Sequence, residues 1–160
     1  MNLIWLFVIT IVVYVYLSYY YRYPKHVSML QTSLSRFDLN LLQEKQPIVI
    51  EDAIKDAHPV IKAWFPWNPS RTWQTIIPEV WIKNKYKYLI IHPQVDTDVF
   101  LYPPNLPWNH DQPDPEYTIL IVQLKAHQMV IVPLHWKWML EKENACTLTG
   151  LHDGVTWILP

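Results

Sequence analysis

The side chains best suited to metal chemistry gather in the middle of the sequence. His92, Asp96 and Asp98 lie within HPQVDTD, and His110 and Asp111 follow in a proline-rich stretch. Imidazole and carboxylate groups are ordinary ligands of divalent ions, so these residues could form a metal site if the proline-rich stretch folded back over a sheet. Their spacing is irregular, and Asp is also common in turns. Two interpretations therefore stay open: a metal site built on His92, Asp96 and His110, or strand ends and turns.

Other chemistries find less support in the residues. Cys146 is the only cysteine, and no nucleophile motif or basic pair surrounds it, so a buried and unreactive thiol is expected. The two glycines, Gly150 and Gly154, are too few for a glycine-rich phosphate-binding loop. The formal net charge is −1, and basic residues are dense only in the alternating lysines of residues 83–87. A nucleic-acid partner is therefore not expected.

The secondary structure that must position these side chains is predicted to change along the chain from short helices to strands. Two amphipathic stretches predict short helices, Ser35–Glu44 with Asp38 or Ser35 as its cap, and Ala53–Phe65 with a kink at Pro59. From Val80 onward, short apolar runs separated by Pro, Asn, Asp and Gly are typical of an antiparallel barrel or sandwich. The predicted strands are Ile48–Ile50, Val80–Ile82, Tyr86–His92, Val99–Tyr102, Tyr117–Leu124, Met129–Val132, Thr147–Thr149 and Val155–Leu159. The fold class expected is mainly β with short helices (α+β), and the proline-rich segment Tyr102–Pro115 is expected to be a loop.

The N-terminus carries an uncharged apolar run, Leu3–Tyr21. As a helix it would cover about 28 Å, close to the hydrocarbon thickness of a bilayer, so a transmembrane helix is predicted over residues 1–22. A cleaved signal peptide is disfavoured because no basic region precedes the run and no small-residue cleavage site follows it. Basic residues directly after the run predict a single-pass protein with its C-terminal domain on the cytoplasmic side. The residues expected at the membrane interface are Trp5, Tyr19, Tyr20, Tyr21, Arg22, Tyr23 and Lys25.

Two separated stretches resemble JmjC-related cupin-like domains. Residues 45–64, KQPIVIEDAIKDAHPVIKAW, resemble the entry of such domains, and residues 126–140, AHQMVIVPLHWKWML, are similar to their late strand ending in Pro and followed by x-x-W-x-H. The resemblance implies a double-stranded β-helix or small barrel over residues 35–160, with residues 23–34 as a juxtamembrane connector. In active members it also implies Fe(II), bound by His-x-Asp/Glu and a later His and used with 2-oxoglutarate and oxygen.

The sequence departs from that family pattern at the metal ligands. No histidine is followed two residues later by Asp or Glu. When Pro133 and Trp136 are matched to the family motif, Trp138 stands where the late histidine would be, and an indole cannot ligate iron. The residues therefore predict neither a metal nor a catalytic residue. A divergent iron- and 2-oxoglutarate-dependent oxygenase using His92, Asp96 and His110 is the alternative.

The expected function is that of a membrane-anchored, non-catalytic structural or interaction protein. Trp67 in FPWNP and Trp108 in LPWNH are flanked by proline, and exposed aromatic residues often dominate binding to protein partners. The layout resembles membrane-anchored cupin-like proteins of large DNA viruses, which implies a virion or membrane-scaffold role. A small-molecule- or lipid-binding barrel is a further alternative.

Overall fold

The chain folds mainly into β-strands, as seen in a computed structural model whose described residues are 3–23, 26–75, 79–109, 112–114, 116–141 and 146–158. The helices are α1 (Leu3–Tyr20), α2 (Ala57–Trp64) and α3 (Gly154–Ile158), with 3-10 helices η1 (Leu34–Arg36) and η2 (Leu39–Glu44). The strands are β1 (Leu30–Thr32), β2 (Ile48–Ile50), β3 (Ser70–Thr75), β4 (Ile82–Lys83), β5 (Tyr88–Pro93), β6 (Thr97–Tyr102), β7 (Trp108–Asn109), β8 (Gln112–Pro113), β9 (Leu120–Leu124), β10 (Met129–Pro133), β11 (Lys137–Leu140) and β12 (Cys146–Leu151).

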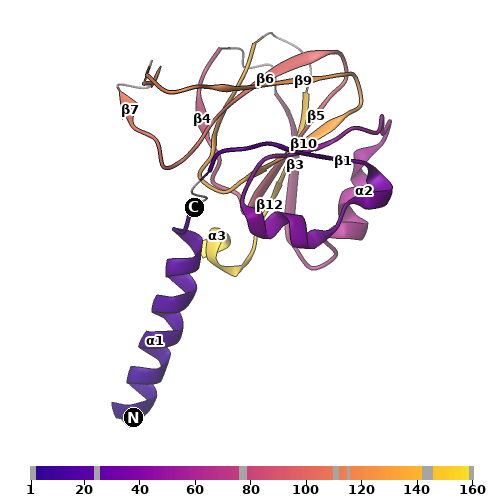
Figure 1. The fold of residues 1–160 in the computed structure, drawn as a ribbon. Helices are drawn as coiled ribbons and strands as arrows, with labels where there is room; N and C mark the ends of the chain where they lie inside the picture. The colour runs from indigo at the N-terminus through magenta and orange to yellow at the C-terminus, as the bar shows by residue number, and fades with distance from the viewer. Residues whose placement is uncertain are drawn as a thin grey trace.

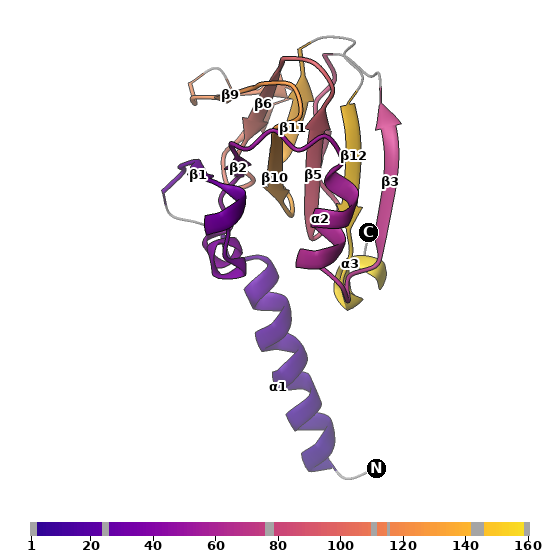
Figure 2. The same cartoon turned by 90° about the vertical axis from the view of Figure 1, so that its right-hand side faces the viewer.

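The strands form two larger sheets that pack face to face (Figure 1, Figure 2). One sheet has the order β1-β2-β10-β5-β12-β3, the other has the order β4-β11-β6-β9, and β7 with β8 makes a separate hairpin. Every pairing is antiparallel except that of β1 with β2. From β3 to β12 the chain passes repeatedly between the two sheets in the strand order of a jelly roll. Among the described residues no pairing joins the two sheets, so they form an open sandwich and not a closed barrel.

Strands β5 and β10 are buried on both faces, which explains their mainly apolar sequences, YLIIHP and MVIVP. Leu89 and Ile91 point into the core between the two sheets, whereas Ile90 points to the other face of the larger sheet. That second face is covered by α2 and η2, which contribute Ile61 and Leu42 to a second core. The predicted runs at residues 86–92 and 129–132 therefore coincide with the two central strands.

Helix α2 starts later than the predicted Ala53–Phe65 helix. Asp56 is its N-cap, and its side chain accepts a hydrogen bond from the His58 backbone N–H at 3.1 Å. Pro59 then falls in the first turn, where its missing N–H has no intrahelical partner to lose, so it produces no kink. In the predicted Ser35–Glu44 helix, Asp38 is the cap, one of the two residues expected in that role, but the turns it starts are 3-10.

The predicted strand at Val155–Leu159 is wrong, because this segment begins as helix α3. The Asp153 carboxylate accepts hydrogen bonds from the backbone N–H groups of Val155 at 3.2 Å and Thr156 at 3.0 Å. Such side-chain acceptors satisfy the free N–H groups of a first helical turn. Local capping therefore overrides the β propensity of the apolar residues that follow.

The prediction of a transmembrane helix over residues 1–22 is wrong. In the parts of the chain that the structure describes, no helix combines the length and apolar character needed to cross a bilayer. Helix α1 contains 18 residues, which at a rise of about 1.5 Å give about 27 Å against a hydrocarbon core of about 30 Å. The single-pass topology and the cytoplasmic placement of the following domain depended on that span and are corrected with it. In both views α1 extends away from the sheets (Figure 1, Figure 2).

Candidate ligand-binding cleft

The residues proposed for a metal site make structural contacts where they are described. His92 ends up buried near the end of β5, and its Nε2 atom lies 2.7 Å from the Ile54 carbonyl oxygen. Asp96 precedes β6 and accepts a hydrogen bond from the Ala126 N–H at 2.8 Å. His110 lies outside the described residues. Among the described residues no group of three or more His, Cys, Asp or Glu side chains is placed to hold a metal ion.

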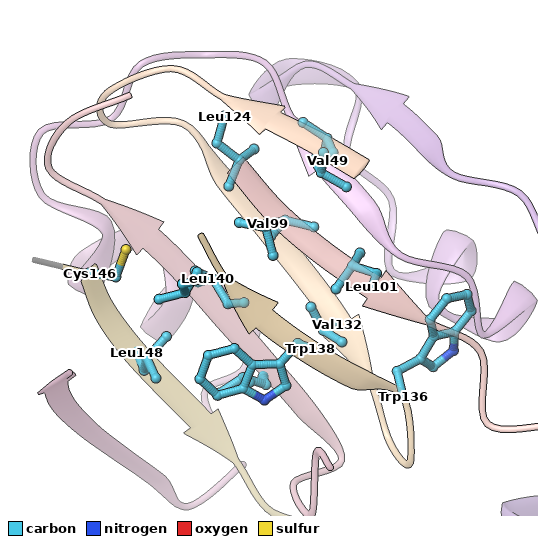
Figure 3. Close-up of a cluster of buried hydrophobic side chains, with 14 residues drawn as sticks. Val49, Val99, Leu101, Leu124, Val132, Trp136, Trp138, Leu140, Cys146 and Leu148 are labelled. Atoms are coloured by element: carbon cyan, nitrogen blue, oxygen red, sulfur yellow. The ribbon is translucent and has the colours of Figure 1, made fainter. Parts of the chain in front are cut away.

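Trp138 lies inside the sandwich, as the sequence predicts. It stands on β11, opposite Ile82 of β4 and Leu101 of β6, and is 3% exposed. Figure 3 shows its indole in the buried cluster between the sheets, together with Leu148 of β12. The indole therefore fills the space between the sheets at the position that the family resemblance gives to a metal ligand.

A cleft of about 410 Å³ opens beside Trp138. Its walls are apolar side chains from both sheets, of which Leu89, Trp138 and Leu148 are buried and Trp73, Ile82 and Tyr86 are half-buried. Three cationic side chains, Arg71, Lys83 and Lys85, stand at its exposed rim, and Asn84 completes the lining. Clefts of this size accommodate small organic ligands, and apolar walls with a few polar groups are typical of such sites.

The charged side chains among the described lining residues are all positive. None of these residues is Asp or Glu, and Arg71, Lys83 and Lys85 form no ion pair with a described residue. Unpaired cations beside an apolar surface attract anions, because part of the screening solvent is excluded there. The described lining residues also include no His or Cys, so they offer no ligand to an iron ion, which needs imidazole or carboxylate groups.

Asn84 is the residue that fixes one wall of the cleft. It is 1% exposed, and its Nδ2 group donates to the carbonyl oxygens of Val132 at 2.9 Å and Pro133 at 2.8 Å. Its Oδ1 atom accepts from the Tyr86 N–H at 2.9 Å. The β4–β5 turn is thereby tied to the end of β10. The sequence analysis missed this role because Asn between two strands is typical of any turn.

His135 connects the segment after α1 to the sandwich. Its imidazole stacks with the Tyr21 ring at a centroid distance of 5.5 Å and meets the Tyr23 ring edge-on at 6.1 Å. The Lys45 ammonium also donates to the Arg22 carbonyl oxygen at 2.8 Å. Tyr21, Arg22 and Tyr23, which are expected at a membrane interface, therefore contact the β domain, while Trp5 is 62% exposed on α1. Lys25 and the side chains of Tyr19 and Tyr20 lie outside the described residues.

Acid should weaken the fold through His135. Burial, followed by the nearby charges of Lys83 and Lys45, lowers the pKa of His135 from 6.5 to about 4. The unfolded chain then binds more protons between these two values, so stability should fall as pH drops from 6.5 to 4. We expect a loss of about 1 to 2 kcal/mol, allowing for solvent screening of a half-buried group.

Urea denaturation across this pH range measures the loss. His135→Asn is the matched control, because His135 has a φ of 68° and Asn tolerates the left-handed region without titrating. The control should lose less stability on acidification than the parent protein. An identical loss in both proteins would rule out His135 as the source.

The two tryptophans expected at a partner surface differ in their surroundings. Trp67 is 93% exposed, on a turn held by the hydrogen bond from Asn68 Nδ2 to the His152 carbonyl oxygen at 2.6 Å. Trp108 packs within the protein: its ring lies 5.4 Å from that of Tyr102, and the Lys137 ammonium stands 3.9 Å from its centroid. A protein partner at Trp67 and Trp108 stays a prediction.

Cys146 is fully buried on β12. Burial raises the pKa of its thiol to about 11, so the group is protonated at neutral pH. A protonated thiol is a poor nucleophile, and the expectation of a buried, unreactive cysteine is confirmed.

Comparisons with known proteins show no family and include a distant structural likeness. No protein-family model and no curated protein sequence matches the chain. A solved structure similar in part is that of Streptomyces albus HEPD with its substrate 2-hydroxyethylphosphonate and Fe(II) bound, at a TM-score of 0.35 and 12% identity. The match covers 56% of this chain and 19% of that chain. A likeness at this level carries no argument about function, which must be inferred from the residues of the chain itself.

Proposed function

We propose that this protein binds a small organic anion with an apolar body in the cleft beside Trp138. The observation that carries the proposal is the combination of largely buried apolar walls with three rim cations and no acidic side chain among the described lining residues. An anionic group would sit at Arg71, Lys83 and Lys85, and the apolar body would enter between the sheets. This develops the small-molecule-binding alternative given by the sequence.

The walls supply the affinity for the apolar part of the ligand. The Trp73 and Tyr86 rings lie 5.3 Å apart between centroids and form one side, and Trp138 lies among the buried residues of the lining. Each methylene transferred from water to such a surface contributes about 0.8 kcal/mol. A ligand with several carbons therefore gains affinity even without a strong polar contact.

The rim supplies selectivity for negative charge. Arg71 carries a planar guanidinium that can donate two parallel hydrogen bonds to a carboxylate or phosphate, while each lysine offers a compact ammonium. Because none of the described cleft residues carries a carboxylate that competes for these donors, the ligand anion is their available partner. Cationic ligands of the same shape should be repelled.

The divergent iron oxygenase finds less support in this cleft. The described lining residues include no His, Cys, Asp or Glu, and the amide of Asn84 uses its oxygen to accept the Tyr86 N–H. The proposal therefore concerns binding and invokes no chemical step.

Binding of decanoate to the full chain, measured by isothermal titration calorimetry, tests the proposal. Decyltrimethylammonium has the same apolar chain and the opposite charge, so it serves as the matched probe. We expect decanoate to bind at least tenfold more tightly than the cation. Arg71→Ala and Lys83→Ala should each weaken decanoate binding about tenfold, the typical effect of losing one charged hydrogen bond.

Lys62→Ala is the control variant, because this exposed lysine lies on α2, away from the cleft lining. It should leave decanoate affinity unchanged. Equal binding of the anionic and cationic probes, or decanoate binding that survives the loss of both Arg71 and Lys83, would refute the cleft as an anion site.

A further inference from the structure

The Tyr86 ring in the cleft wall occupies the space that a side chain at position 150 would fill if that residue were not glycine. Its ring lies directly over Gly150 of β12: the Cγ atom is 2.6 Å from where a Cβ atom on residue 150 would be, and Cδ1 and Cε1 are closer still. Real Cβ contacts are never this short, so only glycine permits the ring to lie here. The two residues are therefore coupled through one small volume.

The neighbours of Gly150 place this coupling at the cleft. In the sheet, Gly150 stands opposite Arg71 on one side and Leu89 on the other, and both of these side chains line the cleft. The Tyr86 ring itself is half-buried and also lines it. A ring displaced from Gly150 by an added methyl group would have to move off β12, and the cleft is the adjacent unfilled volume.

The ring is held in place from several directions. It lies 5.3 Å from the Trp73 ring at an interplanar angle of 37° and 4.7 Å from the His152 ring at 64°. Its backbone N–H is bound to Asn84 Oδ1. His152 in turn meets Trp157 edge-on at 5.4 Å, so aromatic side chains continue beyond Tyr86 toward α3. Removal of the phenol ring would extend an apolar path in that direction.

We propose that the Tyr86 ring sets the depth of the cleft and thereby limits the length of the apolar part of its ligand. Gly150, which has no side chain, lets the ring pack against β12 and so keeps it out of the volume that the ligand occupies. This inference rests on the proposed function, because it concerns the same cleft. It assigns specificity for ligand length to two residues that do not contact the charged group of the ligand.

Straight-chain carboxylates from hexanoate to dodecanoate provide the test, with dissociation constants measured for the full chain and its variants. In the parent protein, affinity should stop rising with chain length once the tail meets the Tyr86 ring. Tyr86→Ala should let it rise further, so that dodecanoate gains at least tenfold over octanoate relative to the parent protein, since each added methylene is worth about fourfold. Tyr86→Phe keeps the ring and should keep the parent preference.

Gly150→Ala should weaken all the longer carboxylates, because the displaced ring enters the cleft. The double variant Tyr86→Ala with Gly150→Ala removes the steric conflict and should recover the chain-length preference of Tyr86→Ala, a coupling that independent residues do not show. This rescue also keeps the test valid if Gly150→Ala alone fails to fold. The inference is refuted if Tyr86→Ala leaves the length preference unchanged or if the double variant is not rescued.

The outcomes separate the two proposals. If the parent protein binds none of the carboxylates, the proposed function fails. If it binds them through Arg71 and Lys83 but Tyr86→Ala changes nothing, the anion site stands and only the role of Tyr86 fails.

Discussion

Asn84→Ala is expected to lower the free energy of unfolding by about 3 to 4 kcal/mol, because a buried unpaired polar group costs about 1 to 3 kcal/mol. The substitution removes the partners of three backbone groups at once: the carbonyl oxygens of Val132 and Pro133 and the N–H of Tyr86. These three backbone groups lie where the β4–β5 turn meets the end of β10, around the Asn84 side chain, which is 1% exposed. Urea denaturation at neutral pH, analysed by linear extrapolation, measures the loss.

Asn40→Ala is the matched control for this prediction. Asn40 is an exposed residue of η2 whose amide donates to Asp38 Oδ2 at 2.9 Å, so it has the same side chain with a solvated partner. Asn40→Ala should lower the free energy of unfolding by less than about 1 kcal/mol, since substitutions at the surface have small effects on stability. If the two variants proved equally stable, the hydrogen bonds of Asn84 would not be what holds the turn.

Trp138→Ala is expected to destabilise the protein by about 3 to 5 kcal/mol, the range found when a large buried aromatic residue is truncated. The indole is 3% exposed and packs in the cluster between the two sheets (Figure 3). Its removal creates a cavity that two packed sheets cannot close by local movement. The same urea measurement applies, and the cleft of the variant should also admit bulkier carboxylates than that of the parent protein.

Trp67→Ala provides the comparison for Trp138, because the side chain is the same and 93% of it is exposed. We expect a change within about 0.5 kcal/mol. If Trp138→Ala lowered the free energy of unfolding as little as Trp67→Ala, the result would contradict the packing of the Trp138 indole between the sheets.

Local sequence patterns determined much of the β domain. Mainly apolar residues at 86–92 and 129–132 predict strands because a strand buried on both faces needs no regular polar side, and β5 and β10 are such strands. Asp38 was identifiable as one of two candidate caps because a carboxylate directly before a helical stretch can accept its free N–H groups. The inward position of Trp138 also followed from the sequence, through the family resemblance.

Other elements depended on partners far along the chain. Strand β3, SRTWQT, has few apolar residues and was not predicted, because it is an edge strand whose place is given by its pairing with β12. At the N-terminus the apolar sequence determined that residues 3–20 are helical, but its interpretation as a membrane span is corrected.

The ligand-binding cleft belongs to the tertiary structure alone. Arg71, Lys83 and Tyr86 are separated along the sequence by residues of other character, and each by itself is typical of a strand end or turn. They come together because β3 and β4 lie on facing sheets, and because Gly150 leaves room for the Tyr86 ring. The sequence by itself determined that the two central strands are buried, since their apolar runs leave no polar face. Only the pairing of distant strands decided which cations and rings share a cleft, because that pairing depends on hydrogen bonds and packing between residues that local patterns do not relate.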